Sequence, residues 1–138
     1  MSLQLDDLFV DEELGEAGVW VNFYNGSRLK LASSENAKYK AYLAKLARKH
    51  RLELDQSNDD STQLIQEITA EALAKHVLLD WEKVAIGGQA DAKYTEELGK
   101  LAILKAPKLK DFILDQAADN TNFLKEQVEQ VKKPTNGS

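Results

Sequence analysis

Two histidines are the residues best suited to catalysis or metal binding, because the imidazole group titrates near neutral pH. His50 lies within an apolar helical stripe, and His76 precedes Val77-Leu78-Leu79-Asp80-Trp81. Neither belongs to an HExxH pattern, and the chain contains no cysteine. The missing cysteines exclude thiolate catalysis and cysteine-ligated metal sites. We therefore interpret both histidines as structural and expect a protein without catalytic residues.

Carboxylates are numerous, but their spacing does not predict a metal or cofactor site. The stretch 55–60 resembles a calcium loop, which requires glycine at its sixth position and glutamate at its twelfth. Asp60 and Gln66 occupy those two positions, so the match fails. Pairs one helical turn apart, such as Glu67 and Glu71, are typical of a solvated helix face. We expect no metal, and without a phosphate-cradling glycine loop we expect no cofactor.

Composition indicates one soluble domain. The 138 residues fall in the commonest size range for a single domain. A net charge of −5 disfavours nucleic acid as the main partner, because phosphate backbones are bound by many lysines and arginines. No basic segment followed by an apolar run opens the sequence, and the apolar runs are too short to cross a bilayer. We expect a cytoplasmic protein without membrane contact.

A β-hairpin is predicted over residues 18–32. Val19-Trp20-Val21-Asn22-Phe23-Tyr24 is rich in β-branched and aromatic residues, and Ser27-Arg28-Leu29-Lys30-Leu31 alternates polar with apolar. Between them, Asn25-Gly26 supplies the two positive φ angles that a type I′ turn requires.

Helical periodicity begins at Ser34 and predicts a helical body over residues 34–133. Ser33 or Ser34 is the expected N-cap of the first helix, and Asp60 or Ser61 that of the second. The apolar stripe of the second helix is expected to continue through Leu79, with Trp81 buried near its end.

The remaining helices are marked by their ends. Thr95 followed by two glutamates is a typical helix start, and that helix should stop before Pro107, which opens the next one. A break is predicted near Asp119, followed by a last helical segment. Residues 1–17 are expected to be a mobile leader and residues 134–138 a disordered tail. The predicted fold is mainly α within α+β, with an N-terminal β-hairpin packed on four to five helices.

One basic group could bind an acidic partner. Lys38, Lys45 and Lys49 fall within a wedge of about 40° on the first helix at ~100° per residue. The alternative is a solvated helix face whose long side chains cover the border of the apolar stripe. The net negative charge of the chain favours this second interpretation.

Local signals along roughly residues 18–125 resemble those of the tail assembly chaperones of siphovirus-like phages and prophages. The residues that carry the resemblance are Gly18-Val19-Trp20-Val21, Gly26, Leu29-Lys30-Leu31-Ala32, Asn36-Ala37-Lys38-Tyr39, Glu71-Ala72-Leu73-Ala74-Lys75-His76-Val77-Leu78-Leu79-Asp80-Trp81, Tyr94-Thr95, Phe112-Ile113-Leu114, Ala117-Ala118 and Phe123. Two features depart from the family: it often has proline where Ala37 stands, and a more acidic loop than residues 85–93.

The resemblance implies a non-catalytic chaperone that acts during tail morphogenesis. Such proteins bind the long, helical tape measure protein and help to recruit tail tube subunits around it. The oligomeric state stays open, a homo-oligomer included. Shielding a helix needs an apolar groove, and we expect surplus apolar side chains near the chain's end, at Phe123, Leu124 and Val128. These three residues are the candidate partner-binding site.

Two other functions compete with this hypothesis. The first is a structural component of the virion, such as a head–tail completion protein or a minor tail protein. The second is a nucleic-acid-binding regulator that uses the basic helix, which the acidic composition disfavours.

Overall fold

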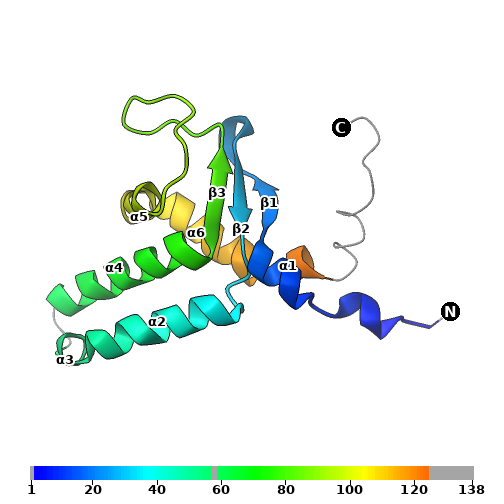
Figure 1. Ribbon diagram of the computed structural model, residues 1–138, viewed down its shortest axis with the longest axis horizontal. Coiled ribbons are helices and arrows are strands. Elements are labelled where there is room, and N and C mark those ends of the chain that lie inside the picture. Colours follow the sequence, from blue (N-terminus) through cyan, green and yellow to red (C-terminus); the bar gives the residue numbers. More distant parts are fainter. Residues whose placement is uncertain (1, 57–58, 125–138) are drawn as a thin grey trace.

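The computed structural model describes residues 2–56 and 59–124, which form a small antiparallel sheet beside a helical body (Figure 1). In chain order the helices and strands are α1 (Glu12–Ala17), β1 (Val19–Asn22), β2 (Arg28–Leu31), α2 (Ala37–Lys49), α3 (Arg51–Leu54), α4 (Asp59–His76), β3 (Leu78–Glu82), α5 (Glu96–Lys105) and α6 (Pro107–Ala118). Short 3₁₀ helices cover Leu5–Leu8, Tyr24–Gly26 and Asn120–Phe123. The predicted fold, mainly α with an N-terminal hairpin packed on helices, is confirmed.

The hairpin turns where the sequence predicts. Asn25 has φ 57° and Gly26 has φ 78°, the two positive angles of a type I′ turn. The amide of Ser27 donates to the carbonyl of Tyr24 over 3.1 Å. Strand pairing runs from Val19 opposite Leu31 to Asn22 opposite Arg28.

A third strand replaces the end of the second predicted helix. We expect an apolar helix through Leu79 and Trp81, whereas α4 ends at His76 and Leu78–Glu82 forms β3, antiparallel to β2. The prediction was wrong because this apolar segment is a strand. Leu78 and Trp81 are buried on the inner face of the sheet and do not belong to the apolar stripe of a helix. A bulge lies between the pairs Lys30–Asp80 and Leu31–Leu78, so Leu79 is not paired with a residue of β2.

The inner face of the sheet and the helices share one core. Leu29 and Leu31 of β2, Leu73 of α4, Ile103 of α5 and Ile113 of α6 are at most 2% exposed. At the hairpin end of this face, the rings of Phe23 and Phe112 pack with centroids 4.6 Å apart. The core thus joins elements from both halves of the chain.

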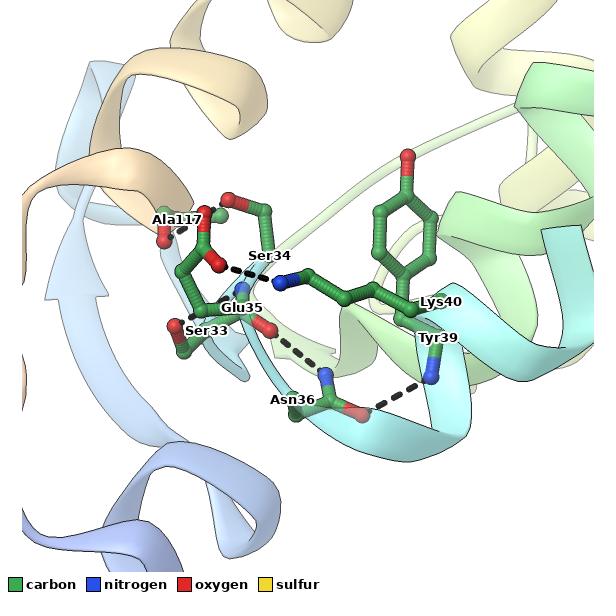
Figure 2. A network of polar contacts seen from close by, with 7 residues as sticks. All are labelled: Ser33, Ser34, Glu35, Asn36, Tyr39, Lys40 and Ala117. Atoms are coloured by element: carbon green, nitrogen blue, oxygen red, sulfur yellow. Dashed lines mark hydrogen bonds and ion pairs between the residues drawn. The ribbon is translucent and has the colours of Figure 1, made fainter.

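Asn36 begins α2 and connects it to its neighbours (Figure 2). Its side-chain oxygen accepts the amide of Tyr39 over 2.9 Å, which makes Asn36, not Ser33 or Ser34, the N-cap. The reason is that both serines have other partners. The hydroxyl of Ser33 accepts the amide of Glu35, and Ser34 donates to the carbonyl of Ala117 from its amide and its hydroxyl. The side-chain nitrogen of Asn36 also donates to the carbonyl of Ser33 and, over 3.2 Å, to that of His76.

The ends of the later helices agree with the sequence signals. Thr95 caps α5 by accepting the amide of Leu98 over 3.1 Å. The helix stops at Lys105, and Pro107 is the first residue of α6, where its missing amide and fixed φ are tolerated. Asp119 ends α6 and caps the following 3₁₀ helix.

Residues 1–17, expected as a mobile leader, contain α1 and a hydrogen-bonded attachment to the body. The amide of Asp11 donates to the carbonyl of Phe123 over 2.7 Å, and Val10 forms a β-bridge with Leu124. Residues 2–9 are exposed and lead away from the body (Figure 1). The predicted tail, residues 134–138, lies outside the described residues. Among the helices described, none has the length and hydropathy needed to cross a membrane.

Trp81 generates the first prediction. Its side chain is 5% exposed, and its indole nitrogen donates to the carbonyl of Ala92 over 2.7 Å. Trp81→Ala removes both the packing and the hydrogen bond, so unfolding in urea should become easier by about 3–5 kcal/mol. Trp20→Ala is the control, because Trp20 is 37% exposed and should cost only about 1 kcal/mol. Equal losses for the two variants would contradict the burial of Trp81.

Asn36 generates the second prediction. Asn36→Ala loses the N-cap, worth about 1 kcal/mol, and leaves the His76 carbonyl without its side-chain donor, a further loss of about 1–3 kcal/mol. Asn36→Ser restores a capping oxygen without the reach to His76, so its stability should fall between the wild type and Asn36→Ala. Urea unfolding of the three chains measures this order. Equal stabilities of the two variants would show that the bond to His76 contributes nothing.

Candidate functional site

A groove lies where α4, α5 and α6 meet, and we call it the helical groove. It consists of two adjoining hollows of about 450 and 310 Å³, both lined by Gln66 and Leu104. The remaining lining residues are Asp59, Thr62, Gln63, Glu67, Ile103, Pro107, Lys110 and Asp111. The lining is thus mostly polar, with Leu104, Ile103 and Pro107 as its apolar members.

Two leucines on α5 remain exposed, and one of them lines this groove. Leu104 lies in the groove and is 40% exposed, and Leu101, one turn earlier, is 42% exposed. They occupy one side of α5, whereas Ile103 on the other side is buried in the core. The helix thus divides its apolar residues between the core and the solvent.

Close packing of α5 on Tyr94 holds this wall of the groove in place. Gly99 faces the Tyr94 ring so closely that a Cβ at position 99 would lie 2.9 Å from the ring carbon carrying the hydroxyl. The same hydroxyl donates to the carbonyls of Ala74 and Leu78, at the end of α4 and the start of β3. Burial raises the pKa of Tyr94, so the hydroxyl keeps its proton for this role. A glycine at position 99 is therefore required for α5 to approach α4.

The rim of the groove is negatively charged. Asp59, Glu67 and Asp111 contribute three carboxylates, opposed among the lining residues by Lys110 alone. An amphipathic segment with lysine or arginine beside its apolar face would be complementary to this rim.

A polar cluster beside the groove connects α2, α4 and α5. The hydroxyl of Tyr42 donates to Glu71 over 2.8 Å, and the ammonium of Lys100 lies 3.5 Å from the same carboxylate. The hydrogen bond from Tyr42 lowers the pKa of Glu71, and Lys100 and Lys49 act in the same direction. Glu71 therefore stays ionised at neutral pH and links the three helices.

The candidate partner site at the chain's end is only partly at the surface. Phe123 is fully buried, which corrects its assignment to a partner-binding surface: the ring is covered because α1 and the last 3₁₀ helix pack together. Leu124 is partly buried and bridges to Val10. Val128 lies outside the described residues. The two described residues of this site, Phe123 and Leu124, therefore do not form an exposed patch.

The three basic residues do share the solvent face of α2. Lys38, Lys45 and Lys49 are all exposed, and Lys38 forms an ion pair with Glu16 of α1 at 2.6 Å. The two histidines have ordinary structural contacts: His50 lies 3.0 Å from the carboxylate of Glu53, and the His76 ring packs edge-on against Tyr42. Within residues 2–56 and 59–124, acidic and histidine side chains do not cluster as a metal site would require.

The sequence analysis did not identify the helical groove. The available signal was that five apolar residues within the seven positions 98–104 cover more than one side of a helix. A helix of that kind must be covered on several sides, by its own fold or by a partner.

Known proteins give one informative match. Residues 34–133 match the family described as YdaY prophage protein, a range that contains α2 to α6 and the whole helical groove. No curated protein and no solved structure is detectably similar to the chain. Since the match extends over more than half of the sequence, the chain belongs to the YdaY prophage protein family.

Proposed function

We propose that this prophage protein is a non-catalytic tail assembly chaperone that holds an amphipathic helical segment of the tape measure protein in the helical groove. The observation that carries the proposal is the exposure of two leucines on one side of α5. Leu104 is 40% exposed and lines both hollows, and Leu101, one turn earlier, is 42% exposed. Large aliphatic side chains at that position gain free energy when a partner removes them from water.

The spacing of the exposed leucines suits a helix. A partner helix presents apolar side chains at spacings of three and four residues, and Leu101 and Leu104 repeat at the same interval. Pro107 adds an exposed apolar side chain at the start of α6. The contact is small, which fits a chaperone that must release its client when the tail tube forms.

The charge of the rim adds specificity. With Asp59, Glu67 and Asp111 around the groove, a client helix flanked by lysine or arginine is favoured over an acidic one. Long tape measure helices are repeatedly amphipathic, so one chaperone could engage several segments in turn.

Two independent lines support the choice of a phage morphogenesis role. The residues quoted above resemble tail assembly chaperones, and the chain belongs to a prophage protein family. Recruitment of tail tube subunits would require a second surface, distinct from the groove. Tail assembly takes place in the host cytoplasm, where we expect the protein to act.

The decisive experiment is co-expression with the tape measure protein encoded in the same prophage. Wild-type chain should raise the soluble fraction of the tape measure protein severalfold. A Leu101→Glu/Leu104→Glu variant should lose this effect, because two buried carboxylates in the contact would lack partners. Circular dichroism should show an unchanged fold, since both side chains are exposed.

The matched control is Ile65→Glu. Ile65 is 51% exposed but lies on α4 and not on the leucine-bearing side of α5, so this variant should keep the tape measure protein soluble. If Ile65→Glu fails and the double leucine variant works, the contact lies elsewhere on the helical body. If wild-type chain never increases solubility, the chaperone function is refuted. Abundant chain in purified particles would instead identify a virion component.

A further inference from the structure

Charge is distributed very unevenly along the first third of the chain. Residues 1–16 contain six acidic residues and neither lysine nor arginine, whereas residues 37–51 contain six lysines or arginines and no acidic residue. Like charges within one block repel each other, whereas the acidic block and the basic block attract each other. The two blocks therefore form a complementary pair.

The acidic block includes an exposed apolar arm, residues 2–10. Three leucines of the arm are exposed, Leu3 by 72%, Leu5 by 59% and Leu8 by 52%. Asp6 and Asp7 lie between the last two of them. The arm is attached to the body at its base, where Asp11 and Val10 bond to the end of the chain. Several exposed leucines on one short segment indicate an interaction surface more than a solvated terminus.

The basic block forms the solvent face of α2 and continues into α3. Lys38, Ala41, Lys45 and Arg48 are exposed and repeat at intervals of three and four residues. Because alanine is small, the centre of this face is shallow, and another chain can approach the helix closely. Just beyond, Leu52 is 81% exposed. We call Lys38, Ala41, Lys45, Arg48 and Leu52 the basic face.

The arm does not lie on the basic face of its own chain. In Figure 1 the arm leaves the body on one side, whereas α2 runs toward α3 on the opposite side. Within one copy, the ion pair of Lys38 with Glu16 joins the two blocks at the first turn of α2. A second copy is therefore the partner whose charge and apolar residues match both surfaces.

We propose that the N-terminal arm of one copy docks on the basic face of α2 and α3 in a second copy. Leu5 and Leu8 contact the alanine surface and Leu52, while Asp6 and Asp7 lie beside Lys45 and Arg48. This contact is head-to-tail, so each dimer keeps one unoccupied arm and one unoccupied basic face. Further copies can add until a ring closes or a filament forms. Neither surface is part of the helical groove, so the assembly does not depend on the chaperone function.

Sedimentation of the full chain over a range of concentrations tests the proposal. At about 50 mM salt, where charges act over roughly 14 Å, the average mass should rise with concentration. At about 500 mM salt, where the range is roughly 4 Å, association should weaken at least about tenfold. A wild-type chain that stays monomeric at low salt overturns the proposal.

Two variants remove one surface each. Leu5→Ser/Leu8→Ser alters the arm, and Lys45→Glu/Arg48→Glu reverses the charge of the basic face. Each variant alone should be monomeric, but an equimolar mixture should form a dimer, because one chain supplies an intact arm and the other an intact face. The mixed dimer should grow no further. Lys105→Glu/Lys108→Glu, with two exposed lysines on other helices, should associate like the wild type.

The mixture also separates this proposal from other causes of association. A mixture that remains monomeric refutes the pairing of arm and face, and so does either variant associating as strongly as the wild type. A 30-base-pair DNA duplex serves as the competing probe. If Lys45→Glu/Arg48→Glu loses duplex binding while its self-association is unchanged, the basic face binds nucleic acid and the proposal is wrong.

Discussion

The carbonyl groups at the end of α4 are the constraint on which the rest of the structure depends. A helix leaves its last carbonyls without partners inside the helix, and here that end is buried, so other segments must supply the donors. Tyr94 donates to the carbonyl of Ala74, Asn36 to that of His76, and the amide of Ala32 to that of Val77 over 2.8 Å. These donors come from the segment before α5, the cap of α2 and the residue after β2. One helix end therefore sets the positions of the sheet and of two helices.

The helical groove is a consequence of this arrangement. Tyr94 cannot reach α4 unless α5 lies close against its ring, and Gly99 provides the space. With α5 held there, its buried side fills the core through Ile103, and Leu101 and Leu104 are left facing outward. Glu71 strengthens the same contact through Lys100. The exposure of the two leucines thus results from requirements of the core, and the proposed binding surface lies on the reverse side of a structural contact.

Local signals predicted most element boundaries, and non-local contacts account for the failures. The turn at Asn25, the cap at Thr95 and the break at Pro107 depend on neighbouring residues, so the sequence alone suffices. Strand β3 was missed because its partner is β2, far away along the chain, and no turn residue separates it from α4. Phe123 was misplaced for the same reason, since its burial requires α1. Of the candidate site, the start of α5 at Thr95 and its end before Pro107 were predicted, but not which of its apolar residues face the solvent.

The order of the strands has a consequence for folding during synthesis. Arg28 and Glu82, which pair across β2 and β3, are 54 residues apart, and the whole helical pair of α2 and α4 is made between them. Contacts of such separation form late, because the intervening loop must close first. An isolated two-stranded hairpin is marginally stable in water. The β1–β2 hairpin therefore emerges from the ribosome with an uncovered apolar face. At a synthesis rate of about 5–20 residues per second, several seconds pass before β3 has been made. During that interval the nascent chain is most vulnerable to misfolding and to proteases.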